Sequence, residues 1–326
     1  MTEIGTPMNG IFGMTELALD TADASDRCDF LLRTRACASS LMPILKHVLD
    51  FSKIEAGHCE LERTGFGLAD VLEGVLDTLA VDADRRGLGL VGSLAPGSSP
   101  HVLGDPGRLR QILLNLGTNA LKFTEHGEVE MRLEAVAAGD RVRLVGSVRD
   151  SGIGISQDKQ DTIFDSFTQA HAGDPRNFGG TGRGLAIVQR LVRAMDGNVT
   201  VTSAVDQGTT FTFTVMLEPF VDSDDASSDL NGLRALVVDT NVTSARVLEE
   251  ILRSAGAVPV STSGNQPDVV IVSVPPGADE VHALADYLLP GVPVVVGTSI
   301  RRIATAASRA TDAVVLAKPV KHRVLV

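Results

Sequence analysis

The stretch Asn115-Leu116-Gly117-Thr118-Asn119-Ala120-Leu121-Lys122-Phe123-Thr124 decides how the middle of the chain is built. Apolar residues precede and fill it, so we expect a helix with Asn119 near its inner face. A carboxamide oxygen there is a neutral, hard ligand of the kind that suits Mg²⁺, an ion that keeps several waters and binds substrate phosphates. Lys122 shares the helix face and can reach a phosphate. The stretch therefore predicts one wall of a site for a phosphate and its magnesium ion.

Two glycine-rich segments follow, Asp150-Ser151-Gly152-Ile153-Gly154-Ile155 and Gly179-Gly180-Thr181-Gly182-Arg183-Gly184-Leu185. Asp150 ends an alternating run expected to form a strand, and a buried carboxylate there needs a donor such as the exocyclic amine of adenine. Glycines at 152 and 154 let the backbone approach a base more closely than residues with a Cβ. The second segment opens an expected helix, 185–195, whose free N–H groups and dipole favour an anion.

Four motifs thus stand in one order between residues 115 and 185, since Phe164-Asp165-Ser166-Phe167 lies between the two glycine-rich segments. This combination resembles the ATP-binding domain of the GHKL superfamily, with Asn119 in the N box, Asp150 in G1 and Gly182 in G2. It is not a P-loop, because no Gly-x-x-x-x-Gly-Lys-Ser/Thr occurs. The alternative is an α/β core whose glycines serve only its turns.

The resemblance implies that the chain binds ATP, with Mg²⁺ held by Asn119 and the adenine pocket lined in part by the hydroxyl of Thr209. The composition of residues 168–181 suits a lid that orders over the phosphates. Arg183 stands where the family usually has a small or apolar residue, and it either reaches a phosphate or stays solvated. The implied ATP-site residues are Asn115, Asn119, Lys122, Asp150, Gly152, Gly154, Phe164, Phe167, Gly180, Thr181, Gly182, Arg183, Gly184, Leu185 and Thr209.

Composition indicates a multidomain protein with real hydrophobic cores. The 326 residues suggest two or three domains, and 44% of them are hydrophobic. The net charge of −12 disfavours nucleic acid or an anionic membrane as the main partner. The three cysteines have no metal-binding spacing and fit a reducing compartment. No apolar run approaches the length of a membrane span, so we expect a cytoplasmic chain or the cytoplasmic part of a longer one.

Residues 1–60 are expected to form a helical hairpin, with helices over 1–20 and 27–55. Apolar positions on the second helix are spaced by sevens, fours and threes, which gives a seam of the coiled-coil kind. A lone hairpin would leave part of this seam in water, whereas two hairpins paired in a four-helix bundle would bury it. The other possibility is a single hairpin packed on the ATP-binding domain. The seam positions are Phe30, Cys37, Leu41, Ile44, Val48 and Phe51.

The hairpin carries two telling segments, Thr2-Glu3-Ile4-Gly5-Thr6-Pro7-Met8-Asn9-Gly10 and Leu49-Asp50-Phe51-Ser52-Lys53-Ile54-Glu55-Ala56-Gly57. They resemble the dimerisation and phosphoacceptor hairpin of hybrid sensor histidine kinases. The resemblance implies a homodimer formed through this hairpin and a catalytic set of Thr2, Glu3 and Thr6, with Glu3 as general base.

The acceptor position itself departs from the family. There the residue before the Glu is the histidine that receives the phosphoryl group, and here it is Thr2. None of the seven histidines stands at that place, and His47 on the long helix is only a remote substitute. A threonine hydroxyl is a far poorer nucleophile without a strong base, so we do not expect phosphorylation of Thr2.

Residues 61–217 are expected to form the ATP-binding domain, an α/β sandwich, and the acidic, polar residues 218–232 a linker. The expected helices lie near 68–86 and 106–122, and a short one follows Ser156. The expected strands are 127–137, 141–150, 198–203 and 209–216.

Residues 233–326 alternate short apolar runs with helical segments, which indicates a parallel sheet covered on both faces. The expected strands are 235–239, 258–260, 269–272, 292–296 and 313–316, and the expected helices 244–254, 279–289 and 300–309. This part resembles a flavodoxin-like receiver domain. The matching positions are Asp239, the metal-side acid, Thr298, the switch hydroxyl, Lys318, the phosphate-facing lysine, and Ser273, which replaces the phosphorylated aspartate.

The receiver resemblance is degenerate. Besides Ser273, the second acid is replaced by Thr240. The connection 262–267 is too short for the usual crossover helix, and the residues after 316 leave no room for a last helix, so we expect an incomplete pseudo-receiver. It could bind a nucleotide second messenger through Arg301, Arg302 and Arg309 on one expected helix, although a solvated face explains these arginines as well.

These resemblances predict the cytoplasmic core of a hybrid histidine kinase that binds MgATP for phosphoryl transfer to histidine in a two-component phosphorelay. Its partners would be a second copy of the chain and a downstream receiver or phosphotransfer protein. Because its own acceptor is missing, it either phosphorylates a histidine on another chain or acts as a pseudokinase, a regulatory scaffold responsive to ATP or a second messenger. A GHKL ATPase of the mismatch-repair or heat-shock chaperone kind fits the N box but not residues 1–57.

Overall fold

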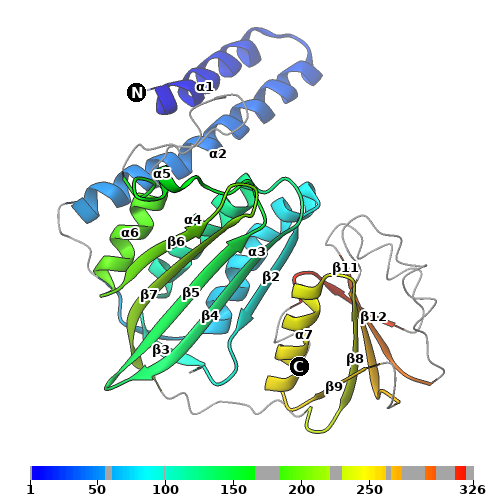
Figure 1. Cartoon of the computed structure of the whole chain (residues 1–326). Helices are drawn as coiled ribbons and strands as arrows, with labels where there is room; N and C mark the ends of the chain where they lie inside the picture. The colour runs from blue at the N-terminus through cyan, green and yellow to red at the C-terminus, as the bar shows by residue number, and fades with distance from the viewer. Residues whose placement is uncertain are drawn as a thin grey trace.

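The computed structural model has three parts, a helical hairpin, an α/β sandwich and a second, parallel sheet (Figure 1). This is the predicted architecture. In residues 2–4, 40, 42–55, 313 and 317 only the backbone is described. The residues that the structure describes are 2–55, 61–98, 100–165, 184–220, 230–261, 266–273, 291–298 and 313–320.

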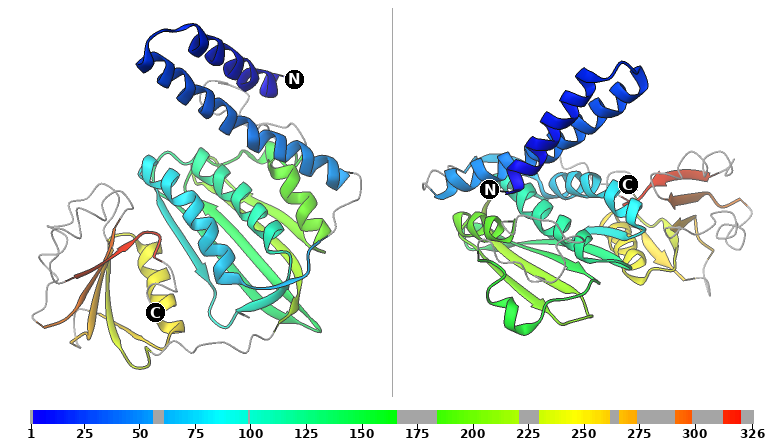
Figure 2. Two further views of the ribbon diagram at one scale, coloured as in Figure 1. Left: turned by 180° about the vertical axis from the view of Figure 1, so that it is seen from behind. Right: turned by 90° about the horizontal axis from the view of Figure 1, so that it is seen from above.

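The hairpin consists of α1 (Thr2–Asp20) and α2 (Ala24–Glu55) and projects from the sandwich in every view (Figures 1 and 2). The second helix begins three residues earlier than predicted because Asp23 caps it: its Oδ1 accepts the N–H of Ser25 at 2.7 Å. Several large apolar side chains of the hairpin are exposed in the single chain, among them Phe12, Leu19, Leu31 and Leu32.

The sandwich has one mixed sheet in the order β1-β3-β7-β5-β4-β2, with β6 also paired to β7. The central pairs β4–β5 and β5–β7 are antiparallel, and β2 runs parallel to β4. The strands are β1 (Thr64–Gly67), β2 (Gly89–Leu94), β3 (His101–Gly104), β4 (Glu128–Ala138), β5 (Arg141–Asp150), β6 (Asn198–Ser203) and β7 (Thr209–Pro219). The helices are α3 (Leu68–Arg86), α4 (Pro106–Phe123), α5 (Gln157–Gln160) and α6 (Gly184–Ala194).

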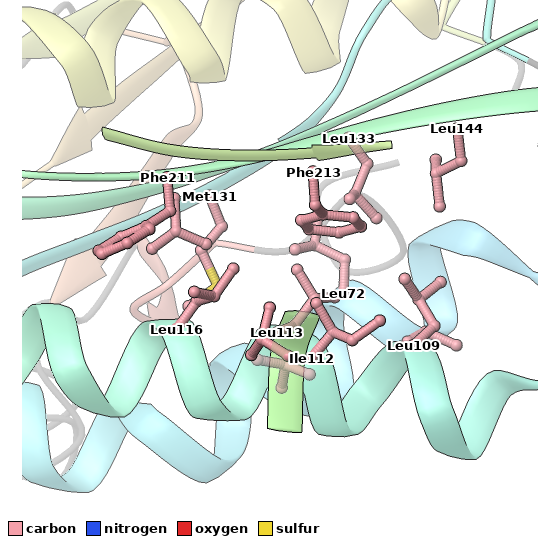
Figure 3. Packing of buried hydrophobic residues seen from close by; sticks show 14 of the residues in the cluster. Leu72, Leu109, Ile112, Leu113, Leu116, Met131, Leu133, Leu144, Phe211 and Phe213 are labelled. Atoms are coloured by element: carbon pink, nitrogen blue, oxygen red, sulfur yellow. The ribbon is translucent and has the colours of Figure 1, made fainter. Parts of the chain in front are cut away.

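The helices α3, α4 and α6 cover one face of this sheet, and the main hydrophobic core lies between the two layers (Figures 2 and 3). The strands alternate as predicted, so that Met131 and Leu133 of β4 and Leu144 of β5 point at the helices, with Phe213 of β7 beside them. On α4 the inner row Leu109, Ile112, Leu113 and Leu116 is fully buried. We call the opposite side of the sheet its outer face.

The second sheet is parallel, in the order β12-β11-β10-β8-β9, which is the flavodoxin-like arrangement. Only residues 261–268 connect β9 to β10, which lie on either side of β8, in agreement with the predicted short connection. The helices predicted over 279–289 and 300–309 fall outside the described residues. The elements are β8 (Arg234–Asp239), α7 (Val242–Ser254), β9 (Val258–Val260), β10 (Val269–Ser273), β11 (Val294–Thr298) and β12 (Ala313–Ala317).

Among the helices in the described part of the chain, none combines the length and apolar character that crossing a membrane requires.

Candidate nucleotide site

The helix α4 carries the two predicted asparagines and is fixed firmly at its start. Asp105 caps it by accepting the N–H of Arg108 at 2.9 Å, and its other carboxylate oxygen accepts the N–H of Glu62 at 3.0 Å. Pro106 follows at the first helical position, where a missing N–H costs nothing. With its inner row buried against the sheet, the helix places Asn115 and Asn119 one turn apart on its side toward α6.

The two amides meet the beginning of α6. A β-carbon added to Gly184 would lie 3.8 Å from Nδ2 of Asn119 and 3.9 Å from Oδ1 of Asn115. Nδ2 of Asn115 is buried, and no described residue hydrogen-bonds it. An orphaned donor beside a helix N-terminus is a place where an anionic ligand is stabilised.

Asp150 is buried at the end of β5, and its Oδ1 accepts the N–H of Gly152 at 2.9 Å and that of Thr209 at 3.2 Å. Among the described residues, none donates to Oδ2. Burial raises the pKa of Asp150, and the two backbone hydrogen bonds offset only part of that rise. The carboxylate is therefore held in place by one oxygen and is free to accept a donor from a ligand through the other.

The two G1 glycines have a reason in the protein itself that the sequence interpretation missed. A β-carbon at Gly152 would collide with the carbonyl of Phe123, and one at Gly154, where φ is +69°, with the carbonyl of Ala204. The close approach that needs glycine is therefore already made by the chain's own backbone. In addition, Ile153 donates its N–H to the Phe123 carbonyl at 3.3 Å, which fastens the end of α4 to the loop after Asp150.

Lys122 and the aromatic residues line the same end of the sandwich. Burial lowers the pKa of Lys122, whose Nζ lies 4.7 Å from the centre of the Phe123 ring. The ring of Phe164 packs edge-on against Phe211, with centroids 6.2 Å apart. Leu185, on the first turn of α6, packs against the same core.

Thr209 and two serines, Ser151 and Ser203, form a hydrogen-bond network beside Asp150. The hydroxyls of Ser203 and Thr209 lie 3.0 Å apart, and Ser203 Oγ also accepts the N–H of Ile155 at 2.8 Å. Ser151 Oγ accepts the N–H of Glu128 at 3.0 Å and donates to the carbonyl of His126 at 3.1 Å. Ser151 lies within the first glycine-rich segment but was given no role there, and Ser203 lies outside every quoted motif.

Several predicted site residues fall outside the described part of the structure: Phe167, Gly180, Thr181, Gly182, Arg183 and the expected lid. Thr2 and Glu3 belong to α1, but their side chains are not described, whereas Thr6 is exposed on the same helix.

The four receiver-like residues come together at the carboxyl edge of the parallel sheet. Asp239 and Ser273 are paired in register on adjacent strands, and Thr298 ends the next strand, its carbonyl accepting the N–H of Lys318 at 2.7 Å. The Ser273 hydroxyl is buried and meets no hydrogen-bond partner among the described residues. Burial lowers the pKa of Lys318, and the charge of Asp239 opposes that shift.

Two family descriptions match the chain. Residues 104–219 match the "Histidine kinase-, DNA gyrase B-, and HSP90-like ATPase" family, and residues 3–57 match the "His Kinase A (phospho-acceptor) domain". The second match begins at Glu3, one residue after Thr2.

Similar proteins are signalling kinases. The chain is 38% identical over 254 residues to the signal transduction histidine-protein kinase BarA of Escherichia coli K12, a match that covers 77% of this chain. It is 38% identical over 258 residues to the sensor protein GacS of Pseudomonas syringae pv. syringae, covering 78% of this chain. Each match spans only 28% of the relative's length.

A solved structure resembles nearly the whole chain. It is full-length ShkA in complex with AMPPNP, with 28% sequence identity and a TM-score of 0.76. The likeness covers 98% of this chain and 68% of ShkA.

Proposed function

The chain belongs to the hybrid sensor histidine kinases, whose core it carries, and from that premise we propose that it binds MgATP and transfers the γ-phosphoryl group to histidine in a two-component phosphorelay. Thr2 precedes Glu3 at the place where the resemblance implies the acceptor histidine, so we propose that the histidine belongs to another chain.

Two observations together support this proposal: the Asp150 carboxylate has only one of its oxygens hydrogen-bonded among the described residues, and Nδ2 of Asn115 is buried without a described partner. Asp150 keeps Oδ2 free of any described donor, which suits the exocyclic amine of adenine. Asn115 and Asn119 face the beginning of α6, which suits the phosphates, with Asn119 as the Mg²⁺ ligand. Mg²⁺ would neutralise charge on the phosphates, and ShkA was solved with an ATP analogue.

The chemistry left to the protein is mostly positioning. Phosphoryl transfer gains its rate from alignment and charge stabilisation, so a core that orients ATP can act on any histidine brought into line. Glu3 would take the proton from that imidazole if the acceptor hairpin docks where α1 begins.

The alternative is a pseudokinase. Replacement of the acceptor histidine by Thr2 favours it, since a core that binds ATP without an acceptor can still signal through its conformation. The pseudo-receiver would then be the regulatory part, and Ser273 in place of an acid leaves it without a phosphorylation site.

Incubation with γ-labelled ATP separates the two. The chain is incubated alone and with a kinase hairpin that carries the acceptor histidine, and Asn119→Asp serves as the inactive control. Label on the added hairpin, absent with Asn119→Asp, supports transfer in trans. Tight nucleotide binding with no label on either protein supports the pseudokinase.

The binding site has its own test. Asn119→Asp places a negative charge where the proposed phosphates and metal lie, and Asp150→Asn removes the carboxylate charge while keeping an acceptor for the two backbone N–H groups. We expect both variants to lose affinity for an ATP analogue in calorimetric titration while keeping their far-UV circular dichroism. Unchanged affinity in both would refute the site.

The remaining proposals concern partners and place. The exposed apolar side chains of the hairpin support a homodimer built through it. A downstream receiver or phosphotransfer protein would take the phosphoryl group, and the reaction would occur in the cytoplasm, where ATP and such partners are found. A second-messenger nucleotide at the pseudo-receiver stays a proposal, because the arginines that suggested it lie outside the described residues.

A further inference from the structure

Part of the outer face of the ATP-binding sheet is buried by something other than its own domain. Gly92 of β2 faces the helices, because a β-carbon there would meet the side chain of Leu76 on α3. The alternation of the strand therefore turns Val91 and Ser93 to the outer face, beside Glu130 and Arg132 of β4. Such positions are normally solvated, yet Val91 is 8% exposed and Ser93 only 2%.

The element that covers them is α7 of the receiver-like domain, which lies between the two sheets in both side views (Figures 1 and 2). Its Val247 and Ile251 form a separate buried cluster with Val91. Its Leu252 packs instead against the receiver-like sheet, with Ile271. The helix is thus apolar on two sides, and each side has its own partner domain.

Charged side chains continue the contact beyond the apolar cluster. Arg132 Nη1 lies 2.8 Å from Glu250 Oε2, and Arg246 bonds both Glu130 of β4 and Glu250 of its own helix. Burial alone raises the pKa of Glu250, but the hydrogen bonds from Arg132 and Arg246 outweigh it and hold that pKa below its ordinary value. The two acids and two arginines are therefore matched across the interface.

Glu128, at the start of β4, connects this interface to the candidate adenine pocket. Its carboxylate accepts Nδ2 of Asn241 at 2.6 Å and the hydroxyl of Thr243 at 2.5 Å. Its main chain is bonded to Ser151 on both sides, donating to Oγ at 3.0 Å and accepting the Ser151 N–H at 3.2 Å. Ser151 directly follows Asp150, so one residue has its side chain in the interface and its backbone in the pocket wall.

We propose that the receiver-like domain docks through α7 on the outer face of β2 and β4, and that this docking and nucleotide binding at Asp150 strengthen each other through Glu128. Docking holds the turn before β4 against the G1 loop, which preorganises the pocket wall. By linkage, bound nucleotide must favour the docked state by the same factor. The coupling rests on the proposed nucleotide site, whereas the docking does not.

The docking is tested by thiol labelling in the full chain. Ser93→Cys places a thiol under α7, and peptide mass spectrometry distinguishes it from the native cysteines. Adding Ile251→Asp puts a carboxylate against Val91, and we expect labelling of residue 93 to become about tenfold faster or more. Val242→Asp on the same helix is the matched control, because Val242 is 83% exposed, and it should leave the thiol protected. Equal labelling in all three chains would overturn the docking.

The coupling is tested by calorimetric titration of AMPPNP into Ile251→Asp, Thr243→Val and Val242→Asp. Thr243→Val deletes one hydrogen bond to Glu128 and is nearly isosteric, so it reports on the connection without unfolding α7. We expect affinity to fall about fivefold or more in Ile251→Asp, less in Thr243→Val, and not in the control. Unchanged affinity in a chain whose residue 93 has become accessible would overturn the coupling. Absence of AMPPNP binding in the unaltered chain would instead refute the proposed function, leaving the labelling result to stand.

Discussion

The raised pKa of Asp150 makes the stability of the fold and the affinity for nucleotide change in opposite directions with pH. Burial raises its pKa above the ordinary value of the unfolded chain, so the native state binds this proton more tightly. The resulting stability is fully present below the ordinary pKa and is lost as the pH rises through the raised one. Affinity for nucleotide changes in the opposite way: binding uses the ionised carboxylate, so it weakens as the pH falls through the same raised pKa.

We therefore expect mildly acidic buffer to weaken binding of an ATP analogue while the contribution of Asp150 to the free energy of unfolding increases. Calorimetric titration and urea unfolding, each repeated across this pH window, measure the two quantities. Asp150→Asn is the control, since it should flatten both profiles without removing the acceptor for Gly152 and Thr209. Parallel profiles for the variant and the unaltered chain would contradict the assignment.

Gly154 and Gly87 can be compared directly, because both have φ of +69° but only Gly154 has backbone close to where a β-carbon would lie. At Gly87, the residue after α3, a β-carbon would meet open space, so Gly87→Ala should cost only the left-handed conformation, about 1–2 kcal/mol. Gly154→Ala adds a collision with the Ala204 carbonyl and should cost about 2–5 kcal/mol. Urea unfolding of the two variants measures the difference, and equal losses would mean that the G1 loop relaxes freely.

The hairpin helices carry the clearest unpartnered surface of the described chain. Phe12 of α1 is 61% exposed, and Leu31 and Leu32 of α2 are about half exposed. We expect a homodimer in solution that buries this surface, and Phe12→Asp should weaken the dimer by placing a charge within the exposed apolar surface. Analytical ultracentrifugation measures the change. Val81→Asp on α3, at a site 58% exposed, is the control, and an equal effect of both variants would contradict a dimer interface on α1 and α2.

The sequence predicted elements best where a strong period runs over many residues. The long strands β4 and β5 and the helix α4 match their predicted ranges to within a residue, because alternation or a buried row fixes them. The strands β1, β2 and β3 were missed: each has only four to six residues and contains glycine, and β1 and β3 pair with each other across the 33 residues 68–100.

In the candidate site, too, only residues that stand in a recognisable sequence pattern could be predicted. Asn119 and Asp150 could be predicted because each ends an apolar run beside a recognisable motif. The hydrogen bonds of Ser151 and Ser203 could not be predicted, since a hydroxyl that bonds the backbone across a loop leaves no period in the sequence. Glu130 occupies the outer face of an alternating strand, a position that is ordinarily solvated, and its burial becomes evident only from the contact with α7.

At the scale of the whole molecule, α7 belongs to two cores at once. The hairpin, sandwich and parallel sheet could be predicted as separate parts, because each has its own hydrophobic pattern. Their contact could not, since Val247 and Ile251 lie on an amphipathic helix that would look the same beside any apolar surface. If the contact is a stable one, the sandwich and the receiver-like domain must share part of their stability.

Thermal unfolding in the presence of nucleotide tests that shared stability. A ligand at one hundred times its dissociation constant stabilises the domain that binds it by about 2.7 kcal/mol, a shift of about 5 °C or more. Because α7 is docked on the sandwich, we expect AMPPNP to raise the unfolding temperature of the receiver-like domain as well. In Ile251→Asp the sandwich transition should still move while the receiver-like transition stays in place, whereas Val242→Asp should behave as the unaltered chain. Differential scanning calorimetry resolves the transitions, and a receiver-like transition that ignores nucleotide in the unaltered chain would show that the domains are neighbours without being coupled.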